Sequence, residues 1–323
     1  MKLAMTYSYL KPDLQLIEKA LEETIQADHP VLKQASTQLL HAGGKRLRPM
    51  FVLLAGQFGN YDLEKIKTVA VSLELIHMAS LVHDDVIDES ELRRGKPTVK
   101  AKWDNRIAMY TGDYIFARSL EYLSTLNNPQ AHQILSKTMV ELTFGEMQQI
   151  EDKYNLNQNL RNYLRRIKRK TALLIASSCQ LGAIAANVPL EEEKQLFRYG
   201  YYIGMSYQII DDILDFTASE QQLGKPAGSD LMQGNITLPV LYAMQDPVFN
   251  RDLQTVFSDP SNITEKSIAS LIQYIKGSTA IEDSFALSDH FLQKAFHALD
   301  TLPDIKAKQT FKEIASYIGK RKS

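Results

Sequence analysis

The stretch VAVSLELIHMASLVHDDVID, residues 69–88, decides the fold class. Its apolar residues do not alternate with period two, as a half-buried strand requires, so it predicts an interior helix that is apolar nearly all round. LLIASSCQLGAIAA (173–186) and YGYYIGMSYQIIDDILDF (199–216) have the same character, and proline and glycine stand mainly between such segments. We therefore predict an all-α protein in which residues 1–323 form a single domain around one core.

The composition is ordinary for a soluble globular protein, with 44% hydrophobic and 23% charged residues. The formal net charge of −1 gives no overall field that would attract nucleic acid or an anionic membrane. The single cysteine, Cys179, excludes an intramolecular disulfide and a zinc site built on thiolates. The first residues lack the apolar core of a signal peptide, and no apolar run approaches the ~18 residues of a spanning helix. We expect a cytoplasmic protein with at most peripheral membrane contact and no nucleic-acid partner.

Two of the apolar helices carry the same arrangement of polar residues, ending in D-D-x-x-D. Aspartates near a helix C-terminus oppose the helix dipole, so helix stability does not explain them, although a lone motif of this kind usually lies on a solvated face. Carboxylates at i and i+4 lie side by side, and Mg²⁺ is typically held by one or two carboxylates plus substrate phosphates. We predict Mg²⁺ ligands on both helices, with Asp85 and Asp212 rotated away from them. The two matched sets are His77, Leu81, Asp84 and Asp88, and Gly204, Gln208, Asp211 and Asp215.

Basic residues stand close to both aspartate motifs in the sequence. GGKRLRP (43–49) is not a P-loop, but two glycines followed by Lys45, Arg46 and Arg48 are a plausible anion cradle. Lys170 and Thr171 are expected to open the helix that follows, where the dipole favours an anion. Each group alone would be ordinary surface charge, as would the basic run 161–170, but their clustering beside the aspartates predicts phosphate binding. The remaining members are Arg93 and Arg94, directly after the first motif, and Lys225, after the second.

These motifs together resemble those of the trans-prenyltransferases, the polyprenyl diphosphate synthases. The resemblance rests on GGKRLRP, HMASLVHDDVIDESELRRG, GDYIFARS, KTALL and GMSYQIIDDILDF followed by LGKPAGSD, in the family's order over nearly the whole chain. It implies an isoprenoid-synthase-type helical bundle around a deep central cavity, usually dimeric. It also implies Mg²⁺-dependent head-to-tail condensation of isopentenyl diphosphate with an allylic diphosphate such as farnesyl diphosphate.

A closer resemblance concerns TVKAKWDNRIAMYTGDYIFARSLE and the C-terminal YIGKRK, which are similar to the large catalytic subunits of two-component synthases. It implies a small non-catalytic partner subunit, a product of seven isoprene units, and a role in menaquinone side-chain synthesis.

The resemblance also implies roles for individual residues. Lysine is usual in the family where GNITLP has Asn235, which puts one phosphate contact in doubt. His77 has an alternative interpretation, because one histidine on an apolar helix face is more often a core residue. The implied sets are Lys45, Arg48, His77 and Arg94 for isopentenyl diphosphate; Asp84, Asp88, Asp211 and Asp215 for Mg²⁺; and Arg93, Lys170, Thr171, Gln208 and Lys225 for the allylic diphosphate, with Lys170 and the four aspartates as the catalytic groups.

Product length is expected to depend on Ala79 and Ser80, one helical turn before Asp84. A bulky aromatic side chain there would block a growing prenyl tail, so these small residues predict an open tunnel and a product longer than farnesyl. The alternative is that small residues merely allow close helix packing.

Three other functions are alternatives to chain elongation. A class I terpene cyclase shares the helical fold, but its second metal motif usually has an Asn/Ser/Glu pattern, whereas this chain has DDILD. A non-enzymatic subunit would be expected to lack the metal ligands. A nucleic-acid binder using residues 161–170 is disfavoured by the near-zero net charge.

Overall fold

The computed structural model describes residues 7–219 and 226–321 and divides into two compact units. Each unit is assembled from three stretches of the chain, and the boundary falls within the helices α8, α10, α11 and α18. The prediction of a single domain stays a prediction. Unit 1 consists of Met1–Met139, Ser177–Phe197 and Thr301–Phe311, and unit 2 of Val140–Ala176, Arg198–Asp300 and Lys312–Ser323.

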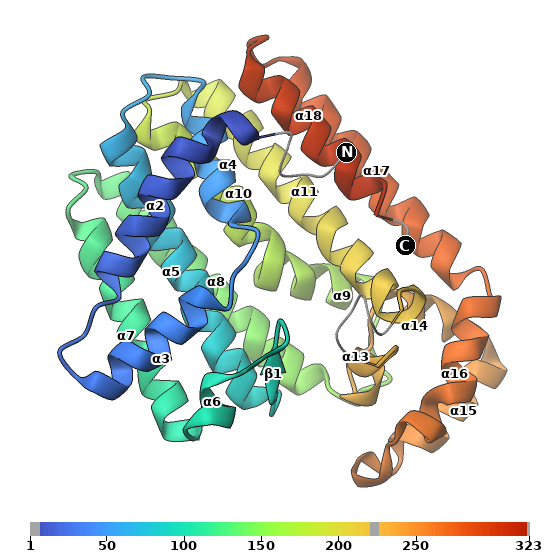
Figure 1. Cartoon of the computed structure of the whole chain (residues 1–323). Helices are drawn as coiled ribbons and strands as arrows, with labels where there is room; N and C mark the ends of the chain where they lie inside the picture. Colours follow the sequence, from blue (N-terminus) through green and yellow to red (C-terminus); the bar gives the residue numbers. More distant parts are fainter. Residues whose placement is uncertain (1–6, 220–225, 322–323) are drawn as a thin grey trace. The chain divides into compact units, whose positions relative to one another are not determined.

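The prediction of an all-α fold is confirmed for the described residues, which contain one two-stranded hairpin besides helices (Figure 1). In chain order the elements are η1 Ser8–Leu10, α2 Lys11–Thr24, α3 Pro30–His41, α4 Leu47–Gly56, α5 Leu63–Ile87, β1 Leu92–Arg93, β2 Lys96–Pro97, α6 Val99–Lys102, α7 Asn105–Ser124, α8 Pro129–Asp152, α9 Leu160–Ile167, the π-helix η2 Lys168–Ala172, α10 Leu173–Ala185, α11 Leu190–Thr217, α13 Ser229–Met232, α14 Leu238–Ala243, α15 Pro247–Phe257, η3 Pro260–Asn262, α16 Glu265–Gly277, α17 Ala280–Asp300 and α18 Lys306–Gly319.

Helix α5 is the centre of unit 1, with α2, α4 and α7 packed against it (Figure 1). It begins at the N-cap Asp62, whose carboxylate accepts hydrogen bonds from the backbone of Glu64 and Lys65. Every residue from 69 to 76 is buried, which explains why the stretch is apolar all round. The helix ends where Glu89 adopts a left-handed conformation, at φ 50°. The buried run therefore delivers its aspartates to the end of a fixed helix.

Helix α5 is also long and apolar enough to cross a membrane by length and composition alone. The prediction that no run reaches that length is wrong for this segment. Within its most apolar window, 67% of the residues are buried inside the protein, so packing in unit 1 accounts for its apolar character.

The sequence ELRRGKPT forms a β-hairpin, which the sequence alone did not predict. Leu92 pairs with Pro97 and Arg93 with Lys96. The two residues between the strands, Arg94 and Gly95, both have positive φ, at 55° and 75°, as a type I′ turn requires. Arg93 stands on β1 and Arg94 in the left-handed turn that follows it, so the neighbouring arginines are directed to different partners.

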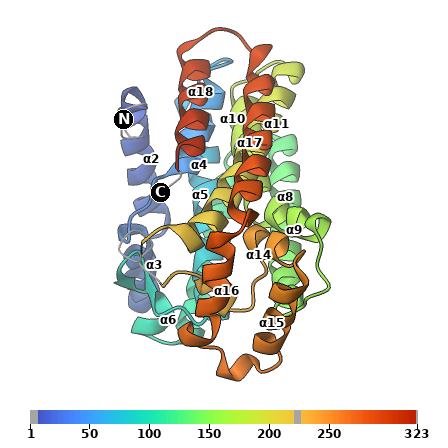
Figure 2. The same ribbon diagram turned by 90° about the vertical axis from the view of Figure 1, so that its right-hand side faces the viewer.

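In unit 2, α14 packs against α17 and also contacts α16 (Figure 2). The core of this unit includes Phe249 of α15, Leu271 of α16 and Phe291 of α17. The π-helical turn η2 continues α9 directly into α10. A side chain at Gly145 of α8 would clash with Arg169, and one at Gly204 of α11 would lie 2.5 Å from the Ala172 Cα. Both helices therefore approach η2 closely, and this contact places its side chains.

Candidate active site

The first aspartate motif lies at the end of α5. Asp84 and Asp88 are partly exposed, whereas Asp85 between them is 2% exposed. The prediction that Asp85 is rotated away from the two candidate ligands is confirmed. Asp84 and Asp88 thus offer carboxylate oxygens at one partly exposed helix end.

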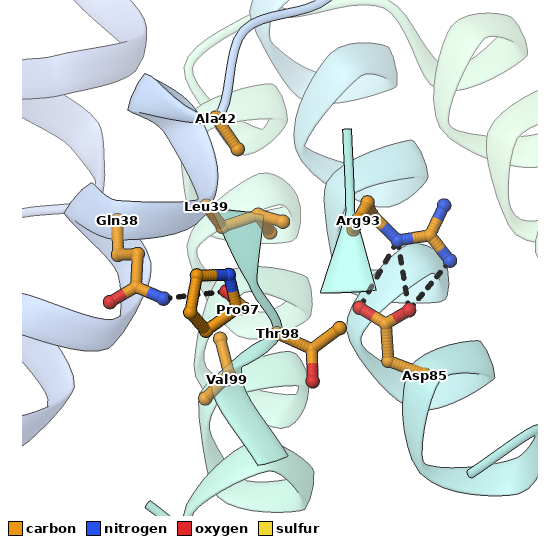
Figure 3. Close-up of a pocket in the computed structure, with 8 residues that line it drawn as sticks. All are labelled: Gln38, Leu39, Ala42, Asp85, Arg93, Pro97, Thr98 and Val99. Carbon is orange, nitrogen blue, oxygen red and sulfur yellow. Dashed lines mark hydrogen bonds and ion pairs between the residues drawn. The ribbon is translucent and has the colours of Figure 1, made fainter. Parts of the chain in front are cut away.

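Asp85 is held by Arg93 of the hairpin. The Arg93 Nη2 lies 2.7 Å from one oxygen of Asp85, and Nε donates to both oxygens at 2.9 and 3.1 Å. Burial raises the pKa of Asp85, and the hydrogen bonds and charge of Arg93 oppose that shift. The pair lies in the wall of a small pocket (Figure 3). Its lining residues are Gln38, Leu39, Ala42, Asp85, Arg93, Pro97, Thr98 and Val99.

Arg94 is directed to the glycine loop before α4. A side chain at Gly44, where φ is 156°, would lie 2.7 Å from the Arg94 Nη1. Glycine is therefore needed for the guanidinium to lie against this backbone. Arg48 and Arg94 are both close enough to His77 to shift its pKa, so the structure gathers three of the four predicted isopentenyl diphosphate contacts. The fourth, Lys45, is exposed on the same loop.

His77 is held neutral in this basic surrounding. Burial lowers its pKa well below the ordinary value, and the charges of Arg48, Arg94, Arg93 and Arg46 lower it further. A neutral imidazole adds no positive charge, but it keeps one N–H that could donate to a phosphate oxygen.

Arg46 has a different role from its neighbours in GGKRLRP. Its guanidinium donates to both oxygens of Glu18 at 2.7 Å, to Glu74 at 3.3 Å and to the Leu40 carbonyl at 3.1 Å. These bonds tie the loop to α2 and α5, so this arginine holds the anion cradle in place. Residue type alone does not separate Arg46 from Arg48, whereas the family resemblance assigned only Arg48 to isopentenyl diphosphate.

In the second motif, Asp211 forms an ion pair with Arg321 from the C-terminal YIGKRK, at 3.0 Å. The Arg321 guanidinium also lies 5.0 Å from the ring centre of Tyr207, one turn before Asp211. Nothing in the sequence pairs residue 321 with residue 211, so Arg321 is a site residue that only the structure reveals. A cation therefore already lies against the Asp211 carboxylate.

Asp215 lies in a different environment. It is 1% exposed, and its two oxygens accept from the Ser229 hydroxyl at 2.9 Å and the Asp230 backbone N–H at 3.2 Å. It thereby fixes the start of α13. The role of Asp215 as a metal ligand stays a prediction. Of the carboxylates of Asp211 and Asp215, that of Asp211 is the more exposed.

Asp212 is buried, with 4% of it exposed. It accepts hydrogen bonds from the Tyr163 hydroxyl at 2.7 Å and from the Gln208 Nε2 at 2.9 Å. Burial, with Asp230 nearby, raises the pKa of Asp212 to about 7, although the two hydrogen bonds lower it. The Gln208 Oε1 in turn accepts from Thr171 at 2.7 Å. The structure therefore brings Gln208 and Thr171 together.

Lys170 and Thr171 do not open a helix, so the prediction of a helix N-terminus there is wrong. They lie within η2, where the Leu173 N–H bonds to the Lys168 carbonyl, so the helical hydrogen bonding continues. Thr171 is a residue type that often caps a helix, but its hydroxyl donates to Gln208 instead. π-Helical turns are frequent at functional sites. The Lys170 Nζ donates to Glu146 and Gln149 of α8, both at 2.9 Å.

The remaining predicted residues are placed as follows. Ala79 is fully buried in unit 1, and the partly exposed Ser80 donates to the His77 carbonyl at 2.9 Å. Asn235 is partly buried, and its backbone N–H donates to Asp230 at 2.9 Å. Lys225 lies outside the described residues.

The donor set fits a Mg²⁺ ion that shares its coordination with a substrate. Within residues 7–219 and 226–321, no group of three His, Cys, Asp or Glu side chains forms a cage for a metal. The candidates are carboxylates in ones and twos, as Mg²⁺ prefers when water and phosphate complete its shell. The Arg321 guanidinium puts a positive charge on Asp211, as a bound Mg²⁺ ion would.

Comparisons with known proteins show which family the chain belongs to. The family model described as polyprenyl synthetase matches residues 29–275. The chain is 60% identical over 322 residues to heptaprenyl diphosphate synthase component 2 of Bacillus subtilis, covering 100% of this chain and 92% of that protein. The crystal structure of heptaprenyl diphosphate synthase from Staphylococcus aureus matches with a TM-score of 0.93 at 43% identity, covering 97% of this chain and 99% of that one.

A metal-containing relative is also similar. The polyprenyl synthase from Caulobacter crescentus, complexed with calcium and isoprenyl diphosphate, matches with a TM-score of 0.94 at 30% identity, covering 100% and 98% of the two chains. The family is metal-dependent, and its members elongate trans-prenyl chains. The resemblance seen in the sequence is confirmed. The chain belongs to the polyprenyl synthetase family and is a trans-prenyltransferase.

Proposed function

We propose that this chain is the catalytic component of a two-component synthase that extends farnesyl diphosphate with isopentenyl diphosphate to heptaprenyl diphosphate. The proposal rests on one observation: carboxylates and basic side chains lie together on α5 and its neighbours. Asp84 and Asp88 end the helix, while Arg48, Arg94 and His77 gather around it. Metal-binding carboxylates and diphosphate-binding cations are both required when two diphosphates react.

The proposed metal is Mg²⁺, held by Asp84 and Asp88 in unit 1 and by Asp211 and Asp215 in unit 2. When bound, Mg²⁺ would neutralise the charge that develops on a departing diphosphate. Lys170, Gln208 and Arg93 would hold the allylic diphosphate, and Lys45, Arg48 and Arg94 would orient isopentenyl diphosphate through its phosphates. Because His77 is neutral, it would contribute one hydrogen bond rather than charge.

The reaction requires no side-chain nucleophile. The allylic C–O bond breaks and its electrons leave with the diphosphate. The double bond of isopentenyl diphosphate then forms the new C–C bond, and loss of one proton restores an alkene. The chain's basic groups would position both substrates for this step, and a deep apolar site would keep water from the cation.

A partner subunit is part of the proposal, because the relative of 60% identity is named component 2 of its synthase. Helix α8 supports it with an apolar stripe whose members are roughly half exposed: Val140, Phe144, Met147 and Ile150, at 53%, 51%, 50% and 43%. Their spacing puts them on one helix face, where a second protein would remove them from water. We also propose that the enzyme acts in the cytoplasm and serves menaquinone side-chain synthesis.

A product assay tests the proposed function. The purified chain would be incubated with Mg²⁺, farnesyl diphosphate and labelled isopentenyl diphosphate, with and without the candidate small subunit, and chain length read by thin-layer chromatography. Seven-unit product that requires the small subunit supports the two-component proposal. Long product from the chain alone would replace it with a self-sufficient synthase. No incorporation in either mixture would contradict the proposed reaction.

A further inference from the structure

A chain of three hydrogen bonds runs from the core of unit 2 to the predicted allylic diphosphate contacts. The Tyr163 hydroxyl donates to Asp212 at 2.7 Å, the Gln208 Nε2 donates to the other oxygen of Asp212 at 2.9 Å, and Thr171 donates to the Gln208 Oε1 at 2.7 Å. Tyr163 is 1% exposed and belongs to the apolar core, so water does not compete for its hydroxyl.

The network fixes the orientation of the Gln208 amide. The Gln208 Nε2 donates to Asp212 and the Oε1 accepts from Thr171, so the amide nitrogen is turned toward the carboxylate and the amide oxygen toward the hydroxyl. Tyr163 holds the second oxygen of Asp212, which keeps that carboxylate from rotating. The orientation of a side chain on α11 therefore depends on a hydroxyl on α9.

Thr171 and Gln208 differ in the hydrogen-bond donors that they have left for a substrate. Thr171 has one hydroxyl proton, which it donates to Gln208. A diphosphate oxygen is an acceptor, so it would have to compete with the Gln208 Oε1 for that proton. Gln208 has a second N–H that this chain of hydrogen bonds does not use. It is thus the member of the pair that can donate to a diphosphate while the network stays intact.

We infer that Tyr163 is a positioning residue for the allylic diphosphate, acting through Asp212 to aim the second N–H of Gln208, with Thr171 holding the amide from its other side. This inference rests on the proposed function, since it names the residues that orient one of its substrates. It adds Tyr163 to the site and assigns Thr171 a supporting role in place of the direct contact expected from the sequence.

The test replaces the tyrosine hydroxyl alone, in Tyr163→Phe. Binding of the non-reactive analogue farnesyl thiodiphosphate with Mg²⁺ would be measured by calorimetry. We expect Kd to rise about five- to tenfold, the cost of one misdirected hydrogen bond to a charged group. In steady-state assays, KM for the allylic diphosphate should rise while KM for isopentenyl diphosphate stays unchanged.

Tyr274→Phe is the matched control, because Tyr274 also hydrogen-bonds an aspartate, Asp246, on a part of unit 2 with no predicted site residue. Its Kd should equal that of the wild type. A double-mutant comparison with Gln208→Ala isolates the path, since Tyr163→Phe and Thr171→Val should have no further effect on binding once Gln208 is absent. Melting temperatures of all variants confirm that they are folded.

Three results would overturn the inference. They are a wild-type Kd in Tyr163→Phe, an equal rise of both KM values, and an undiminished effect of Tyr163→Phe in the Gln208→Ala background. If Tyr163→Phe does not fold, Thr171→Val carries the test, because a loss of binding that persists without Gln208 would make Thr171 a direct contact. Failure of the proposed function would be seen separately, as wild-type protein that makes no prenyl product.

Discussion

The Arg321 Nη1 lies 3.0 Å from the Asp211 Oδ1, so the C-terminal segment places a guanidinium on a predicted metal ligand. The side chains are 20% and 34% exposed, so water screens the pair incompletely. A Mg²⁺ ion that binds Asp211 must displace this arginine or share the carboxylate with it.

The first prediction is that Arg321→Gln tightens Mg²⁺ binding to the substrate-free protein. Removing a competing ion pair of about 1 kcal/mol should lower Kd roughly fivefold. Calorimetric titration with MgCl₂ measures this, with Arg251→Gln, an exposed arginine of α15 in the same unit, as the control. Equal Mg²⁺ affinity in Arg321→Gln and the wild type would mean that Asp211 is not a ligand or that Arg321 does not compete.

The second prediction concerns His77 and pH. Its pKa is lowered in the folded protein, so below the unfolded pKa of about 6.5 the unfolded chain binds more protons than the folded one. The contribution of His77 to stability is complete above that pH and is lost as pH falls, at about 1.4 kcal/mol per unit until the folded pKa is reached. Urea unfolding at several pH values should show a flatter dependence in His77→Asn, while the exposed His29→Asn behaves as the wild type. Parallel curves for the wild type and both variants would contradict a lowered pKa of His77 in the folded protein.

Much of this site could be predicted from the sequence, where local spacing decides the geometry. Helical spacing separated the partly exposed Asp84 from the buried Asp85 on α5, and Asp211 from Asp212 on α11. It did not predict that Asp215 is as deeply buried as Asp212. The hairpin was missed because Arg94 fills a left-handed turn position that normally signals itself with Asn or Gly.

Other features depend on distant contacts. Arg321 meets Asp211 through tertiary packing, which no local pattern encodes. The continuation of the helix through Lys170 was missed because a π-helical turn has no capping signal, and it is stabilised here by close approach of Gly145 and Gly204. Sequence pattern therefore separated exposed from buried carboxylates, and packing determined which groups are already paired.

The third prediction concerns the Asp85–Arg93 pair. Arg93→Ala leaves a buried carboxylate without its bidentate partner, which should lower the free energy of unfolding by about 2 kcal/mol. The double variant Asp85→Asn/Arg93→Ala should recover part of this loss, because the buried charge is removed as well. Chemical denaturation measures both. Equal destabilisation of the single and double variants would mean that the charge on Asp85 does not matter.

The fourth prediction concerns product length. Ala79→Phe should shorten the product, because the ring would block the path that small residues leave one turn before Asp84. Ala79 is fully buried, so some overpacking cost of about 1–3 kcal/mol is expected as well. Chromatography of the products of Ala79→Phe and of the milder Ser80→Ala, both checked for folding, gives the answer. An unchanged product distribution in folded Ala79→Phe would disprove the tunnel.

The fifth prediction concerns the apolar stripe of α8. Phe144→Glu places a charge in the middle of this half-exposed face and should weaken binding of the small subunit at least tenfold. Val248→Glu is the matched control, since Val248 is 59% exposed on α15, outside the stripe. Pull-down and activity titration with the small subunit measure the effect. Equal binding by both variants would remove the stripe from the interface.

The most direct test of the central claim is the turnover of labelled isopentenyl diphosphate by Asp84→Ala and Asp211→Ala, with the small subunit and Mg²⁺ present. The exposed Asp289→Ala of α17 is the control, and circular dichroism checks the helix content of each variant. If these carboxylates hold the metals that bind diphosphate, both variants lose turnover by about 10²-fold or more while Asp289→Ala keeps it. Near-normal turnover in folded Asp84→Ala and Asp211→Ala would contradict the account.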